Sequence, residues 1–501
     1  MKKLVALLLC LMMVVPATLA SAETAEGKVL NIWCWNDEFQ SRFNAYYPEV
    51  KEIAEDKSTT TLNDGTIVKW TINPNEGNNY QNKLDEALRA QESAAADDKI
   101  DIFLIEADYA LKYVDSPYTL DVKADIGLTD EDLGGQYKYT QEIATSADGK
   151  LKAVTWQATP GLFAYRRSIA KDVLGTDDPD AVQEALADWD KFNAVAEQAA
   201  AKGYYMLSGY DDAYRTFSNN VSAPWVADDG ETVVVDANLM KWVDQTKLYT
   251  DKGYNHKSSL WDATWAADQG PTGKVFGFFY STWGINFTLL GNSLETSVAN
   301  GGKEEVGNGA YGDYAVCQGP QAYYWGGTWI CAAAGTDNVA TIKDVMQKLT
   351  CDEAIMKQIT MDTQDYTNNE KAMEEIAASD YSSAFLGGQN HIALFAEAAK
   401  KITEDTQDYT NNVAAMNELA QNYSSAFLGG QNHIALFAEA APKIDMSNIS
   451  AYDQGLNESF QGAFKNYFDG NATIDEAKAQ FESIISEKYP ELVNFQWPDA
   501  E

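Results

Sequence analysis

The sequence predicts an α/β protein with a parallel or mixed sheet that is covered by helices. Three observations support this fold class: apolar strand-like segments alternate with helical ones, polar or aromatic residues follow several strands, and the alternation returns later in the chain. A chain of 501 residues suggests roughly two to four domains or two large lobes. Its content of 45% hydrophobic residues is typical of a globular protein with a sizeable core.

The first unit begins with a predicted strand at residues 29–35, followed by the polar loop 36–38 and a helical segment up to Tyr47. A second strand is predicted at residues 67–72, then a helix near 80–93 and a third strand at residues 100–105. In such sheets a ligand binds beyond the carboxyl ends of the strands. The residues after the first and third strands are therefore expected near a ligand.

A second unit repeats the alternation. Strands are predicted at residues 154–157, 204–208 and 275–280, and a helix at residues 189–202. Polar or aromatic residues again follow several of these strands.

Residues 1–22 have the features of a signal peptide, with Lys2 and Lys3 before an apolar segment and a small-residue motif that predicts cleavage after Ala22. The apolar segment is too short to span a bilayer, and no later segment contains 18 apolar residues. We expect an exported protein on the periplasmic or extracellular side. Cys10 lies inside the apolar segment, so no lipid-anchor cysteine is expected at the cleavage site.

The composition excludes several classes of function. With 37 Lys and Arg against 75 Asp and Glu, the net charge of -38 would repel nucleic acid and disfavour an anionic membrane. The sequence contains no Gly-x-Ser-x-Gly elbow and no phosphate-binding loop, and only three histidines. We therefore expect neither an enzyme nor a cofactor. A secreted glycoside hydrolase needs only a carboxylate pair and stays the alternative, whereas a lectin-like adhesin would predict repeated binding modules.

The four cysteines outside the signal peptide, Cys34, Cys317, Cys331 and Cys351, allow three disulfide pairings, and the sequence does not decide whether any forms. None shares a Cys-x-x-Cys spacing, and we predict no metal site.

The chain carries an internal duplication. Residues 381–399 recur unchanged at 423–441, and residues 362–369 recur at 405–412. Because there are only two copies, at about 362–402 and 405–444, a tandem duplication explains them better than a repeat architecture.

Together these segments resemble the extracytoplasmic solute-binding proteins of carbohydrate ABC importers, which have the type II periplasmic-binding fold and include the maltodextrin-binding proteins. The resemblance rests on the order and spacing of residues 30–35, 99–103, 149–166, 273–284, 324–328 and 449–454. The missing lipid-anchor cysteine and the duplicated block depart from the family pattern.

The resemblance implies two α/β lobes joined by hinge crossings, with the ligand cleft between them. The first lobe is predicted at residues 23–157 and 284–334, and the second at 158–283 and 335–501. The implied function is capture of a mono- or oligosaccharide by hinge closure and delivery to permease subunits in the membrane, by a protein expected to be a monomer. The sequence does not identify the sugar or its length.

The predicted ligand contacts combine aromatic rings, which stack on sugar rings, with carboxylates and amides, which bind hydroxyls. They are Trp35, Asn36, Asp37, Glu106, Asp108, Trp156, Gln157, Tyr210, Asp211, Trp261, Trp265, Trp283, Trp325, Gly326, Gly430, Gln431, Asn432, Tyr452 and Asp453. Asp108 and the pair Tyr452 and Asp453 are chosen because they match family positions.

Purely structural roles compete with several of these assignments. Asn36 or Asp37 could cap the following helix, Asp211 could form a turn, and Trp261 and Trp265 at helical spacing could pack together. In the duplication, the second copy is expected at the cleft, and the first is expected to be an added helical hairpin on the outside of the second lobe. Each copy is expected to form a helix after its Gly-Gly-Gln-Asn turn.

Overall fold

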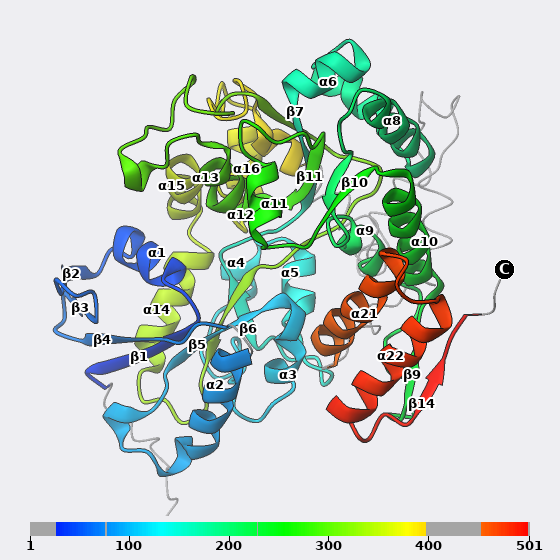
Figure 1. Ribbon diagram of the computed structural model, residues 1–501. Coiled ribbons are helices and arrows are strands. Elements are labelled where there is room, and N and C mark those ends of the chain that lie inside the picture. The colour runs from blue at the N-terminus through cyan, green and yellow to red at the C-terminus, as the bar shows by residue number, and fades with distance from the viewer. Residues whose placement is uncertain (1–26, 76–77, 228, 397–451, 499–501) are drawn as a thin grey trace, which may run out of the picture.

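The computed structural model describes residues 27–75, 78–227, 229–396 and 452–498. A mixed seven-stranded sheet in the order β2-β3-β4-β1-β5-β13-β6 forms the centre of what we term the first lobe (Figure 1). Its strands are β1 (Val29–Cys34), β2 (Val50–Ile53), β3 (Thr59–Leu62), β4 (Ile67–Ile72), β5 (Ile102–Glu106), β6 (Ala153–Thr155) and β13 (Thr328–Ala332). β1 pairs in parallel with β4 and β5, and β13 runs antiparallel to β5 and β6. The predicted α/β class with a mixed sheet is confirmed.

Helices cover this sheet. They are α1 (Glu38–Tyr46), α2 (Asn79–Ala90), α3 (Ala110–Val114), α4 (Asp130–Leu133), α5 (Lys138–Ile143) and α14 (Val339–Thr350), with short 3-10 turns η2 (Gln91–Ser93), η3 (Ala96–Asp98) and η4 (Ala107–Tyr109). α1 buries Phe39 and Phe43, which are four residues apart and therefore lie on one helix face. This packing fixes the start of α1 beside the end of β1.

The second lobe is built on a three-stranded antiparallel sheet in the order β11-β7-β12. Its strands are β7 (Gly161–Arg166), β11 (Gly277–Ser281) and β12 (Tyr314–Cys317), and two small sheets join β8 (Leu207–Gly209) to β10 (Asn255–Ser258) and β9 (Thr232–Val234) to β14 (Asn494–Gln496). In Figure 1 these elements lie above and to the right of the first lobe.

The helices of the second lobe include both those between its strands and the C-terminal pair, which lies beside α10 (Figure 1). They are α6 (Arg167–Leu174), α7 (Pro179–Ala185), α8 (Trp189–Ala201), α9 (Tyr214–Ser218), α10 (Ala237–Lys252), α11 (Ala263–Asp268), α12 (Thr282–Gly284), α13 (Gly291–Ser293), α21 (Asp453–Phe468) and α22 (Ile474–Lys488), with the π-helical turn η5 (Ile285–Leu290) and the 3-10 turn η6 (Val298–Asn300).

Two segments lie in a different lobe from the one that the sequence predicted. Residues 284–327 were assigned to the first lobe, but β12 within them pairs with β7 of the second lobe. Residues 335–350 were assigned to the second lobe, but α14 packs on β6, and Tyr47 of the first lobe donates a hydrogen bond to Asp344 at 2.7 Å. The physical reason is that β13, at residues 328–332, returns the chain to the first sheet, and the helix that follows covers that sheet.

Within the part of the chain that the structure describes, three segments cross between the lobes and are hydrogen-bonded to one another. The amide of Ala158 donates to the carbonyl of Tyr366 at 3.1 Å, and the amide of Asn368 donates to the carbonyl of Trp156 at 2.8 Å. The amide of Trp325 donates to the carbonyl of Thr159 at 3.1 Å. These hydrogen bonds hold the crossing segments together between the two lobes.

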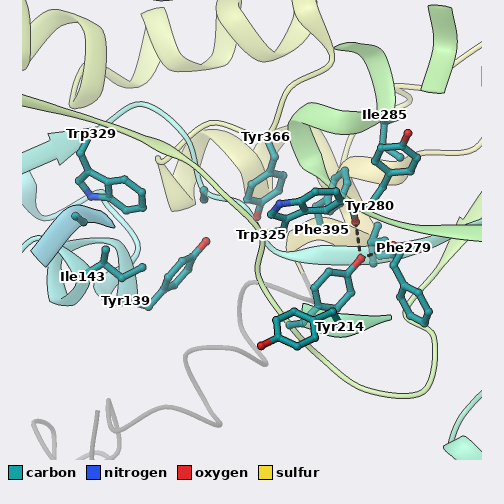
Figure 2. Packing of buried hydrophobic residues seen from close by; sticks show 14 of the residues in the cluster. Tyr139, Ile143, Tyr214, Phe279, Tyr280, Ile285, Trp325, Trp329, Tyr366 and Phe395 are labelled. Carbon is teal, nitrogen blue, oxygen red and sulfur yellow. Dashed lines mark hydrogen bonds between the residues drawn. The ribbon is translucent and has the colours of Figure 1, made fainter. Parts of the chain in front are cut away.

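The first copy of the duplication is part of the core. It follows α15 (Glu353–Thr363) and includes α16 (Glu370–Ala377), and the side chains of Tyr366, Phe385 and Phe395 are fully buried. Tyr366 and Phe395 are 5.7 Å apart and belong to the packed group in Figure 2. The expectation of an added external hairpin is therefore wrong for this copy, because its apolar residues fill the space between the crossings and the second lobe.

The predicted turn and helix are confirmed in the first copy. Gly387 and Gly388 have φ values of 66° and 93°, which glycine tolerates, and residues 391–396 are helical. The second copy, with Gly430, Gln431 and Asn432, lies outside the described residues.

Cys34, Cys317, Cys331 and Cys351 are all free thiols. Among the described residues, no helix combines the length and the apolar character needed to cross a membrane.

Candidate functional site

A cavity of about 620 Å³ lies between the lobes, next to the three crossings, and both lobes contribute to its lining. Its size falls in the range of small-molecule sites. The lining divides by chemistry into two walls, which we name by their side chains. The carboxylate wall consists of Glu38, Glu106, Asp108 and Asp365, and the aromatic wall consists of Trp261, Trp283, Phe287 and Trp325.

The carboxylate wall is organised around two arginines. Arg42 on α1 donates to Asp365 at 2.6 Å and to Glu38 at 3.3 Å. The amide of Gln157 donates to the same two carboxylates, at 3.1 Å and 2.9 Å. Burial raises the pKa of Glu38, and the nearby Asp365 raises it further, whereas Arg42 opposes the shift. Asp365 belongs to the first copy of the duplication, so this copy supplies part of the wall.

The second arginine joins the lobes. Arg215 on α9 forms a two-pronged ion pair with Asp108 on η4, with nitrogen to oxygen distances of 2.7 and 2.5 Å. The Arg215 guanidinium also lies 5.4 Å from the centre of the Trp325 ring. Burial, together with the charge of Asp108, raises the pKa of the neighbouring Glu106 to about 8. The raised pKa favours the protonated form of Glu106, in which the carboxyl can both donate and accept a hydrogen bond.

Several residues that line the cavity also carry a fully buried polar atom with no hydrogen-bond partner among the described residues. These atoms are Nε and Nη1 of Arg42, Oδ1 of Asn75, the hydroxyl of Tyr109 and Oδ1 of Asn286. Buried polar groups are normally paired, because an unpaired one loses its hydration without compensation. Donors and acceptors are both present in this set, and they lie just behind the surface of the cavity.

The aromatic wall is held by ring contacts. Trp261 and Trp283 are nearly parallel, with 15° between their planes and 6.2 Å between ring centres, and Trp283 donates its indole N–H to the Trp325 carbonyl at 2.9 Å. Trp325 is in turn stacked at 6.3 Å on Tyr280, beside which it is drawn in Figure 2. The side chains of Trp261 and Phe287 are 55% and 69% exposed. The wall therefore presents flat apolar surface to the cavity.

Gly326 lies where the two walls meet. Its φ of 70° is in the left-handed region, and an added Cβ would lie only 3.1 Å from the Trp283 indole nitrogen and 3.3 Å from Glu106 Oε1. Glycine is required here because it combines that conformation with the close approach of both walls.

The structure brings nine of the predicted contacts together around the main cavity. They are Trp35, Asn36, Glu106, Asp108, Gln157, Trp261, Trp283, Trp325 and Gly326. Asn36 also accepts a hydrogen bond from the amide of Glu38 at 3.1 Å, so the local turn role exists beside the cavity position. Asp211 lies instead in an adjoining cavity of about 260 Å³, which we call the side compartment.

Three predicted residues lie in the core instead of the cavity. Trp156 is 1% exposed and stacks on Phe39 at 5.1 Å. Tyr210 is 3% exposed and donates its hydroxyl to Asp469, and Trp265 is 1% exposed and donates its indole N–H to Asp212 at 3.0 Å. Trp156 follows the end of β6 in a bend, and its ring is buried against Phe39 and the Arg42 guanidinium of α1, whereas the next residue, Gln157, directs its side-chain amide to Glu38 and Asp365 at the cavity.

Asp37, Tyr452 and Asp453 also do not line either cavity. Asp37 directly precedes α1, Asp453 begins α21, and Tyr452 donates its hydroxyl to Glu491 at 3.0 Å. The expectation that Trp261 and Trp265 lie on one helix is wrong. α11 begins after Asp262, whose side chain caps it, and Trp261 precedes the helix with a φ of 72°. Their rings still touch, at 5.2 Å.

Sequence reasoning missed several lining residues, among them Arg42, Asn75, Arg215, Asp365 and Glu458. Arg42 lies one helical turn after Glu38. That spacing could have indicated an ion pair on α1 but not its contact with Asp365, which is far away in the sequence.

The comparisons with known proteins agree with this architecture. The sequence matches the family of bacterial extracellular solute-binding proteins over residues 57–385, so the chain belongs to that family. No curated protein sequence matches it significantly.

Solved structures share the fold at low sequence identity. An extracellular solute-binding protein of family 1 has a TM-score of 0.61 at 14% identity, and the match covers 92% of this chain and 99% of that protein. The binding protein of an ABC transporter from B. animalis subsp. lactis, solved with β-1,6-galactobiose, has a TM-score of 0.58 at 14% identity, covering 94% and 100%. The GacH receptor of Streptomyces glaucescens, solved without ligand and with acarbose, has a TM-score of 0.57 at 13% identity, covering 93% and 99%. The predicted two-lobed type II periplasmic-binding fold is thereby confirmed.

Proposed function

We propose that this protein is the exported carbohydrate-binding component of an ABC importer. It captures an uncharged sugar between its lobes and delivers it to permease subunits in the membrane. The observation that carries this proposal is the pairing of an aromatic wall with a carboxylate wall in one interlobe cavity. A sugar offers flat C–H faces for the indoles and hydroxyls for the carboxylates.

The charge of the cavity supports a neutral ligand. Apart from Glu106, whose raised pKa favours its neutral form, four acidic side chains line it, namely Glu38, Asp108, Asp365 and Glu458, against Arg42 and Arg215. Both guanidinium groups already contact carboxylates. An anionic sugar would therefore meet more negative charge than positive charge.

Hinge closure follows from contacts to both lobes. Trp35, Glu106 and Asp108 belong to the first lobe, whereas Arg215, Trp261 and Trp283 belong to the second. A ligand that contacts both sets favours the closed arrangement by its differential affinity.

The alternative, a glycoside hydrolase, needs two carboxyl groups that are available to the substrate. Glu106 and Asp108 are candidates because they are neighbours at the cavity, where the amide of Asp108 donates to Glu106 at 2.8 Å. Both oxygens of Asp108 accept hydrogen bonds from Arg215, so no free nucleophile faces the cavity there. We therefore infer binding without turnover.

A thermal-shift screen tests the proposal. Neutral mono- and oligosaccharides, amino acids and short peptides are added to the purified mature chain, and the best ligand is then incubated with the protein and analysed by chromatography. A sugar at 100 times its Kd should add about 2.7 kcal/mol of stability and be recovered intact. Stabilisation by peptides alone overturns carbohydrate binding, and time-dependent cleavage supports the hydrolase.

A further inference from the structure

The side compartment adjoins the main cavity behind the interlobe ion pair. The two cavities share Asp108, Arg215, Trp261, Trp325, Gln454 and Glu458 in their linings. With about 260 Å³, the side compartment is smaller than the ~300–1,000 Å³ of a typical independent site. It is therefore best understood as an extension of the main cavity.

The lining of the side compartment is suited to hydroxyl groups. Asp211 and Ser218 face it from the second-lobe loop and α9, and Asn457 and Gln461 face it from α21. Leu260 provides one aliphatic surface. Carboxylate, hydroxyl and amide groups together offer both donors and acceptors.

Trp261 connects the two compartments. Its indole lines both, is 55% exposed, and is stacked on Trp283 on the main side. The backbone of Trp261 has a φ of 72°, a left-handed conformation that is strained for a non-glycine residue. The capping bonds of Asp262, from the amides of Ser259 and Trp265 at 2.9 and 2.7 Å, hold the strained residue in place. Strain of this kind persists where a side chain is positioned for function.

We propose that the side compartment binds a second sugar unit, so that the site is built for a disaccharide or a longer glycan. One unit lies in the main cavity on the aromatic wall, and the next passes Trp261 and contacts Asp211, Ser218 and Gln461. This inference rests on the proposed function and specifies its substrate class. The Asp108–Arg215 pair forms the partition beside which the glycosidic bond lies.

The test is calorimetric titration with two matched pairs, galactose with β-1,6-galactobiose and glucose with maltose. In the wild type, the disaccharide of at least one pair should bind at least about tenfold tighter than its monosaccharide. Ser218→Leu, which fills the compartment, and Gln461→Ala, which removes a polar group, should each reduce this ratio to less than about threefold. Melting temperatures of the ligand-free variants establish that they are folded.

Gln198→Ala is the matched control. Gln198 on α8 donates to the carbonyl four residues earlier at 3.3 Å, as Gln461 does at 3.1 Å, but it lies away from both cavities. This variant should keep the wild-type ratio. Equal affinity for monosaccharide and disaccharide, or an unchanged ratio in both compartment variants, overturns the inference and leaves the proposed function standing. Failure of all four sugars to bind overturns both.

Discussion

The two walls of the cavity are built in different ways. The carboxylate wall is tied into the fold by ion pairs and hydrogen bonds, such as Arg42 to Asp365 at 2.6 Å and Arg215 to Asp108 at 2.5 Å. In the aromatic wall, Phe287 and Trp261 are 69% and 55% exposed and are held mainly by ring contacts. The difference teaches that residues of the first wall serve stability and binding together, whereas the exposed members of the second wall, Trp261 and Phe287, are available chiefly to a ligand.

The largest expected effect lies just behind the carboxylate wall. Trp156→Ala removes a buried indole that stacks on Phe39 and lies 5.8 Å below the Arg42 guanidinium. The free energy of unfolding should fall by about 3–5 kcal/mol, because a large core side chain leaves a cavity. Urea unfolding followed by circular dichroism measures this change. Trp261→Ala, at an exposed tryptophan, should change stability by less than about 1 kcal/mol, and equal losses in both variants would contradict the distinction.

The aromatic wall should show the opposite behaviour. Trp283→Ala removes the ring that stacks on Trp261, and we expect sugar affinity to fall by about 2 kcal/mol, or roughly 30-fold. Calorimetric titration measures the affinity, and the melting temperature of the ligand-free protein should stay close to that of the wild type. A large drop in melting temperature with unchanged affinity in the folded fraction would show that this wall is structural.

The stability of the protein should depend on pH through Glu106 of the carboxylate wall. The pKa of Glu106 is raised to about 8 in the folded state, against about 4.5 when unfolded, so its contribution to stability is fully present below pH 4.5 and is lost as the pH rises to 8. Between these values the wild type should lose stability relative to Glu106→Gln, by at most about 1.4 kcal/mol per pH unit. Urea unfolding from pH 5 to 9 gives the difference between the two proteins. Parallel stability curves would mean that Glu106 titrates normally.

The smallest effect is expected from shortening the duplication. Deleting residues 370–412 keeps Asp365 in the carboxylate wall and leaves one uninterrupted copy of the repeated sequence. The buried residues Phe385, Leu386, Ile392 and Phe395 are replaced by identical residues of the second copy. The shortened protein should therefore fold and bind sugar as the parent does. Circular dichroism and calorimetry test this, and an insoluble product would mean that both copies are needed.

Much of the fold could be predicted from local sequence patterns. The strands β1, β4 and β5 lie within two residues of their predicted starts because each is a short apolar run between polar loops. The sequence predicted β12 in the first lobe and α14 in the second, and the structure has each in the other lobe. This could not be predicted, because it depends on which strand β12 pairs with, and the pairing partners are distant in the sequence.

The site was predictable where residues follow strand ends or adjoin glycine, as Glu106, Asp108 and Trp325 do. It was not predictable where partners come from distant segments, as with Arg42 and Asp365. Trp156 and Gln157 show a finer limit: only Gln157 lines the cavity, and the sequence does not say which of two adjacent residues in a bend is buried in the core.

The most direct test of the account is calorimetric titration of the mature protein with neutral sugars and their matched uronic acids, such as galactose and β-1,6-galactobiose beside galacturonic acid. We predict saturable binding of a neutral sugar and at least about tenfold weaker binding of its uronic acid, because the cavity carries more carboxylates than arginines. A uronic acid that binds as tightly as its neutral counterpart, or a panel in which no neutral sugar binds, would contradict the account.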